Sequence, residues 1–216
     1  MTPRLYGESG QAAPLYIAAV VGLLFLALMF FAFGQADIRR NETQTAADAA
    51  ALAAAKESRD GLEDALRLNV LDPNWLEDLI EGVVRSPEVG CAEASRFAAE
   101  NDAQGIDCVP LADGRWGVTV RVRSEKPVGK SIVEGTEGQH AEAVATAVVE
   151  SRCVFEPNEV TEEPPTDGED EDPEEEEEKP SPGQFFCDGK KWVIDPTRLD
   201  LLPDMADLFD VRLAEG

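Results

Sequence analysis

An uninterrupted apolar run near the amino end limits what this chain can fold into more than any other feature. Residues 15–33 (LYIAAVVGLLFLALMFFAF) are 19 positions with no charge and no side-chain amide. As a helix they would span roughly 28 Å, which matches the hydrocarbon core of a bilayer. A buried core helix is usually interrupted by a polar residue within two turns. A cleaved secretory signal would have a shorter apolar core and an A-x-A-like exit, whereas this run leads into Gly34-Gln35-Ala36-Asp37. We therefore predict a single transmembrane helix.

The charge of the chain excludes some classes of partner. Its 44 acidic and 19 basic residues give a formal net charge of -25. A nucleic-acid binder needs Lys and Arg to displace counterions, so we expect no nucleic-acid partner. A soluble domain of this charge would also be repelled by anionic lipid.

Much of the negative charge lies in one segment. Residues 156–179 hold 14 Asp and Glu against a single Lys. With its prolines, the segment 156–182 cannot offset the entropy of folding, so we expect an acidic, disordered linker. Weak calcium binding is the alternative, but the Gly and bidentate Glu at the fixed offsets of a calcium loop are missing.

The cysteines bear on which side of the membrane the larger part of the chain lies. Arg39 and Arg40 after the apolar run, against Arg4 before it, would weakly favour the cytoplasm. Four cysteines without a C-x-x-C pair instead suggest two disulfides in an oxidising compartment, with buried free thiols as the alternative. We expect an extracytoplasmic domain. Of the three possible connectivities we favour the one that pairs Cys91 with Cys108 and Cys153 with Cys187. A Cys91–Cys187 link is the competing possibility.

An Ala-rich segment, residues 44–55, follows the apolar run. Because Ala is the best helix former, the membrane helix should continue to about Lys56. Small side chains permit close approach of a partner helix, and a solvated stalk is the alternative. The predicted partner surface consists of five residues: Gln44, Ala47, Asp48, Ala51 and Leu52.

At this point the sequence resembles a known family. The opening Gly10-Gln11-Ala12-Ala13-Pro14-Leu15-Tyr16 and the later Gln44-x-Ala46-Ala47-Asp48-Ala49-Ala50-Ala51-Leu52-Ala53 resemble the TadE/TadG-like proteins of tight-adherence (Flp) pilus assembly. In pilin-like members a prepilin peptidase cuts after a Gly whose fifth following residue is Glu and sixth is Tyr. Gly10, Gln11 and Tyr16 fit this motif, but Leu15 occupies the Glu position. The resemblance therefore implies an uncleaved anchor of the TadG-like kind.

The remainder predicts a small α+β domain. Asp72-Pro73 starts a helix whose Trp75, Leu76, Leu79, Ile80 and Val83 share a face, opposite a segment with Leu62, Leu66 and Val70. The Trp75 stripe is interpreted as core, with a ligand groove as the alternative. Residues 116–123 alternate as a strand does after a turn at residues 111–114. Residues 142–151 are predicted to form a second strand, with helix as a competitor, and Asp188-Gly189 a hairpin turn, after which the tail docks back.

Catalytic motifs are missing from the sequence. The single His140 lies in a Gly-rich context without a nearby nucleophile elbow, and no Gly-rich loop is followed by the Lys of a phosphate site. We expect no enzyme activity, catalytic residue, metal site or cofactor.

The predicted organisation has five parts. They are a leader-like segment (1–10), a Tad-like transmembrane and Ala-rich helix (11–56), an extracytoplasmic α+β domain (57–155), the acidic linker (156–182) and a docking C-terminal segment (183–216). The favoured function is a single-pass membrane accessory protein of a Flp-type pilus or secretion assembly, which meets other subunits through its N-terminal helix. A membrane-tethered binding module unrelated to pili is the alternative.

Overall fold

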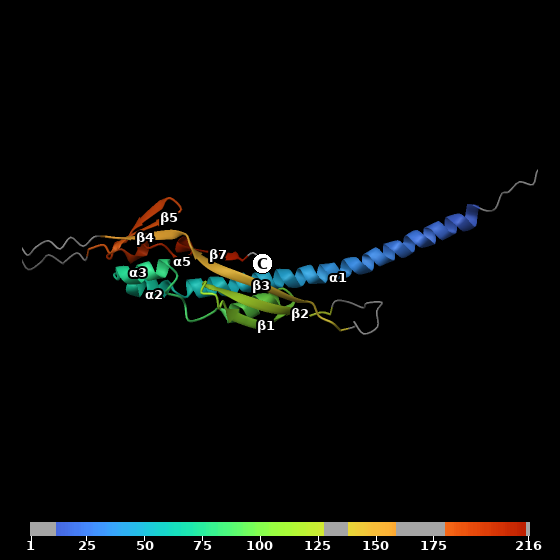
Figure 1. The fold of residues 1–216 in the computed structure, drawn as a ribbon, viewed down its shortest axis with the longest axis horizontal. Helices are drawn as coiled ribbons and strands as arrows, with labels where there is room; N and C mark the ends of the chain where they lie inside the picture. The colour runs from blue at the N-terminus through green and yellow to red at the C-terminus, as the bar shows by residue number, and fades with distance from the viewer. Residues whose placement is uncertain (1–11, 128–137, 159–179, 215–216) are drawn as a thin grey trace, which may run out of the picture.

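The longest element of the structure is one continuous helix. The computed structural model describes residues 12–127, 138–158 and 180–214. Helix α1 (Ala12–Asp60) is 49 residues long and carries the apolar run and the Ala-rich segment, so the predicted continuity is confirmed; it ends at Asp60 rather than near Lys56. The first half of α1 projects away from the other elements, and the second half enters a folded head (Figure 1).

Two short helices follow at the far end of the head, α2 (Glu63–Asn69) and α3 (Pro73–Ile80). The predicted start of α3 is confirmed: the Asp72 carboxylate accepts hydrogen bonds from the backbone N–H groups of Asn74 and Trp75, at 3.0 and 3.3 Å. The predicted facing residues of the two helices are buried: Leu62, Leu66, Val70, Leu76 and Leu79. Val83 was wrongly included in this face, because α3 ends before it and its side chain is 64% exposed.

A strand that the sequence analysis missed comes next. Helix α4 (Cys91–Glu100) leads into β1 (Ala103–Pro110), which pairs antiparallel with β2 (Gly117–Ser124). Gln104 and Gly105 lie inside β1, although Gly at such a position is more typical of a turn. Their pairing register shifts between Gly105 and Asp107, a bulge that removes the alternation by which a strand is recognised.

The main sheet has four antiparallel strands in the order β1-β2-β3-β7. β3 (Glu142–Ser151) has the predicted bounds, so the competing helix is wrong. The predicted docking of the tail is confirmed in a specific form: helix α5 (Met205–Leu208) is followed by β7 (Phe209–Leu213), which pairs with β3 and completes the sheet.

The Ala-rich half of α1 packs with α4 against one face of this sheet. Five of its alanines have no exposed surface: Ala46, Ala47, Ala50, Ala51 and Ala54. The approach to α4 is equally close, because a Cβ on Gly90 would lie 2.3 Å from the Ala54 carbonyl oxygen. The same core reaches Phe209 in β7, so the expected boundary at residue 57 falls inside it. The segment is therefore not a solvated stalk, and its small side chains serve close packing within the chain.

A second, three-stranded antiparallel sheet lies at the far end, in the order β4-β5-β6. Its strands are β4 (Cys153–Pro157), β5 (Gly183–Cys187) and β6 (Lys190–Val193), and a 3-10 turn, η1 (Leu199–Leu201), follows. The Asp188-Gly189 hairpin is confirmed, with φ of 47° and 83° at its two turn residues, as a type I′ turn requires.

The ends of the expected acidic linker belong to this sheet. Glu156 and Pro157 pair with Gln184 and Gly183, and the Asn158 N–H donates to the Pro182 carbonyl oxygen at 3.1 Å. The boundaries at 156 and 182 are corrected accordingly, because backbone pairing extends the folded part past them. The expected disorder concerns residues 159–179, which lie outside the described residues.

Both disulfides connect elements of the head. Cys91 at the start of α4 is bonded to Cys108 in β1, and Cys153 in β4 is bonded to Cys187 in β5. These are the two pairs that the sequence analysis favoured. The second joins the paired strands β4 and β5, whose residues on either side of the acidic sequence are described.

We expect Ala50→Leu to destabilise the head by about 1–3 kcal/mol, because the added atoms have no space between α1 and the elements packed on it. Leu and Ala have similar helix propensities, so helicity should change little. Urea unfolding of the full chain in detergent, followed by tryptophan fluorescence, measures the effect. Ala99→Leu is the control, because Ala99 is exposed on α4. Equal midpoints for the two variants would contradict the packing described here.

Removing either disulfide should lower the free energy of unfolding, and the loss should increase with the logarithm of the number of residues in the loop that the disulfide closes. With sequence separations of 34 and 17 residues, the chain-entropy estimate is about 4 kcal/mol for Cys153→Ala/Cys187→Ala and about 3 kcal/mol for Cys91→Ala/Cys108→Ala. Urea unfolding of the two double variants tests the order. Non-reducing peptide mapping of protein from its native membrane tests the pairing, and free thiols at all four positions would reject it.

Candidate assembly interface

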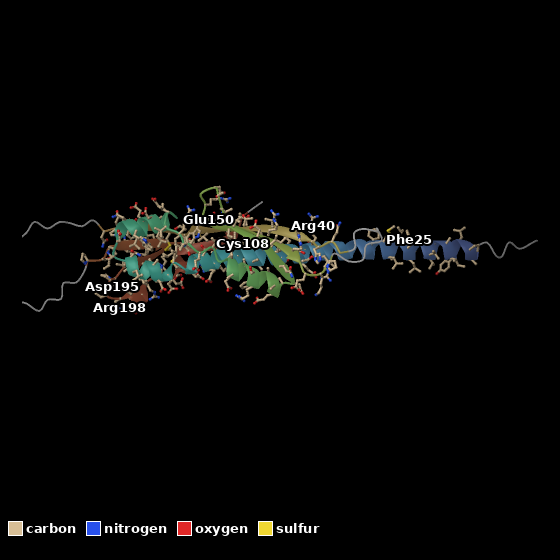
Figure 2. All side chains as sticks on the ribbon, turned by 90° about the horizontal axis from the view of Figure 1, so that it is seen from below. Phe25, Arg40, Cys108, Glu150, Asp195 and Arg198 are labelled. Carbon is tan, nitrogen blue, oxygen red and sulfur yellow. A yellow bond between two sulfur atoms is a disulfide. The ribbon has the colours of Figure 1, made fainter. Side chains whose placement is uncertain are left out.

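The projecting half of α1 is a continuous apolar surface that nothing else in the described chain covers. Residues Ala13–Phe30 have a mean hydropathy of 2.4, and none of them is buried. In Figure 2 this half, marked by Phe25, extends beyond the head with its side chains directed away from the axis on all sides. A core helix of a soluble protein would be buried, so this surface requires cover from lipid or from another polypeptide. By length and composition the helix can cross a membrane.

The residues of the prepilin-peptidase-like motif are only partly described. Gly10 and Gln11 lie outside the described residues. Tyr16 lies on α1 and is 73% exposed. The structure therefore places Tyr16 on the apolar surface and gives no geometry for the preceding bond.

The predicted partner surface on the Ala-rich half is divided by the fold. Ala47 and Ala51 are fully buried against the chain's own head, which corrects their assignment to an intermolecular contact. Asp48 and Leu52 are half-buried, and Gln44 is exposed. The Gln44 side-chain amide donates to the Asp48 carboxylate at 2.8 Å and to the Val144 carbonyl oxygen at 3.3 Å. These polar groups thus attach α1 to β3, and the expectation of a shared Gln44 and Asp48 face holds within the chain.

The charged residues of the head mostly pair with one another. The Arg212 guanidinium lies 2.6 Å from a Glu150 oxygen and, through this hydrogen bond, lowers the pKa of Glu150 below its usual value. Arg115 lowers the pKa of Asp113 in the same way. Arg85 donates to the carbonyl oxygens of Gly82 at 2.6 Å and of Gly114 at 2.5 Å, and so attaches the end of α3 to the loop before β2. These charged side chains therefore join neighbouring elements of the head to one another.

Neither His140 nor the carboxylates of the described residues form a reactive cluster. His140 Nδ1 lies 2.6 Å from the Ser124 carbonyl oxygen, at the end of the head where β2 and β3 are nearest to the projecting helix. Across residues 12–127, 138–158 and 180–214, no group of three or more His, Cys, Asp or Glu side chains is arranged to hold a metal ion.

Trp75 belongs to the core, as the sequence analysis interpreted it. Its side chain is partly buried and packs against the main cluster of buried residues. A separate cleft of about 260 Å³ lies between the end of α3 and the main sheet. Trp116 and Phe209 contribute to it, with ring centroids 5.3 Å apart. No sequence signal indicated this cleft, because its residues come from four distant segments.

Comparison with known families found a match that covers most of α1. Residues 10–57 match the family model Tad, described as "Putative Flp pilus-assembly TadE/G-like". No curated protein and no solved structure matches the chain. The match ends three residues before α1 does and includes both the apolar surface and the buried alanines. Residues 10–57 of this chain are therefore similar to the TadE/G-like family.

Proposed function

We propose that this protein is a single-pass membrane accessory subunit of a Flp-type pilus or secretion assembly and acts without catalysis. The observation that carries the proposal is the division of α1. One half of the helix is apolar and uncovered, the other half forms the core of the head, and both lie in the segment that matches the Tad family. The subunit would be held in the membrane by its first half and meet other subunits there.

The head is proposed to lie outside the cytoplasm. Two disulfides connect its elements, and disulfides persist in oxidising compartments. The proposed organisation is an anchor up to residue 33 and one head that contains residues 38–127, 138–158 and 180–214. The second half of α1 supports one head, because its alanines and the tail strand share a core.

A membrane-tethered binding module unrelated to pili is the second candidate. The cleft beside the buried Trp116 and Phe209 favours it, because a small concave site with apolar walls and a few charged side chains is typical of ligand binding. The two candidates differ in what accompanies the protein after mild detergent extraction. Flp assembly subunits should accompany it under the first proposal and should be missing under the second.

The mature protein should retain its first residues, because Leu15 stands where pilin-like members carry the Glu needed for processing. Amino-terminal sequencing of membrane-extracted protein measures this directly. We expect a terminus before Gly10. A mature terminus at Gln11, especially a methylated one, would reject the uncleaved anchor and favour a pilin-like role.

Gly22→Ile should reduce copurification of assembly subunits several-fold if a partner helix packs on the Ala18 and Gly22 side of α1. An added Cβ at Gly22 meets no atom of this chain within 4 Å, so the change leaves the subunit's own fold intact. Leu24→Ile is the matched control, because two residues place it about 200° around the helix. Quantitative mass spectrometry of detergent extracts provides the measurement. Equal copurification for both variants and the unmodified protein would reject this contact side. A complete lack of assembly subunits with the unmodified protein would reject the proposed function.

A further inference from the structure

A polar cleft lies where α1 leaves the head. Its volume is about 280 Å³, and it is lined by residues of α1, the end of α4, the turn between α4 and β1, and the end of β2 with the residues just after it. Figure 2 places Arg40 at this end of the head, next to the projecting half of α1. Any lipid around that half would therefore be adjacent to the cleft.

The helix geometry sets the height of the cleft above the apolar run. α1 is unbroken between Phe33, the last residue of the run, and Arg39 in the cleft. Six residues of helix rise about 9 Å, close to the outer edge of the headgroup layer. Side chains on a helix lean toward its N-terminus, which here is the membrane side. The Arg39 guanidinium is paired with Glu42, one turn further along α1, and 37% of the Arg39 side chain is exposed.

The cleft contains charges of both signs. Its cations are Arg39 and Lys126, and its anions are Glu42, Glu100 and Asp102. Arg39 lies 2.9 Å from Glu42, and Lys126 lies 3.2 Å from Asp102. The side chains of both pairs are partly exposed, so water or a ligand can compete for them. Glu100 is also paired with Arg96, which lies outside the lining, at 2.6 Å. The other two carboxylates match the two cations in number, so a headgroup that carries both charges fits the cleft better than a purely anionic one.

We propose that this cleft binds the phosphoethanolamine headgroup of a zwitterionic phospholipid. Phosphate oxygens would accept hydrogen bonds from Arg39 and Lys126, and the ammonium would donate to the carboxylate of Asp102 and share that of Glu100 with Arg96. A phosphocholine headgroup has no N–H to donate, and a phosphoglycerol headgroup brings no cation to the carboxylates. The inference rests on the proposed membrane anchor. It adds a specific lipid contact that would hold the head at the bilayer surface.

The test uses the full chain reconstituted in vesicles of equal parts dioleoyl phosphatidylethanolamine, phosphatidylcholine and phosphatidylglycerol. Native mass spectrometry after mild detergent release counts the lipids that remain bound. We expect phosphatidylethanolamine to be enriched at least about threefold over each of the other two, as a partly exposed charge pair allows. The variant Arg39→Gln/Lys126→Gln should lose this enrichment. The control Arg67→Gln/Lys191→Gln removes two cations from the far end of the head and should keep it.

Equal retention of the three lipids, enrichment of phosphatidylglycerol, or equal behaviour of the two double variants would overturn the headgroup site. An alkaline carbonate wash of native membranes separates this failure from failure of the anchor. Protein that stays in the washed membrane without lipid preference would reject the cleft alone. Release of the protein by the wash would reject the proposed anchor and the cleft together.

Discussion

The structure depends on one helix whose two halves have different surroundings: the first half is uncovered and the second half is buried in the head. The first half of α1 is apolar on every side, as a bilayer requires, and the second half is lined with alanines that let a sheet and a second helix approach its backbone. A larger side chain such as Leu would bury more apolar surface per residue but would push the sheet away. Helix α1 continues without a break through the junction between the projecting half and the head.

The remainder of the head is built to hold this helix from several directions. The buried Trp116 side-chain N–H donates to the Ser58 hydroxyl of α1 at 3.1 Å, and the Trp116 ring packs edge-on against Phe209. Arg59 donates to the Phe209 carbonyl oxygen at 3.3 Å. The last strand is therefore attached to the first helix, across about 150 residues of sequence. Fixing the tail in this way closes the core over the alanines.

Some elements of the fold could be predicted from the sequence and others could not, and the difference has physical reasons. Asp72-Pro73 and Asp188-Gly189 have local backbone requirements that few other residues meet, so the α3 start and the β5–β6 turn were predictable. β1 was not, because a bulge and an exposed edge position remove the alternation on which strand recognition depends. The alanines predicted a helix and close packing, but a methyl group does not specify its neighbour. Only tertiary structure shows that the neighbour is the chain's own sheet.

The continuity of α1 relates the orientation of its projecting half to that of the head. A partner that packs on one side of the projecting half would fix the rotation of α1 about its axis. Since the main sheet is packed on the same helix, that rotation would also determine which face of the head is presented to a partner. The exposed sheet face carries cross-strand pairs such as Arg123 with Glu142, whose charges are already neutralised. Specificity would then arise mainly from how the helix is held, and the head would follow the helix as a single body.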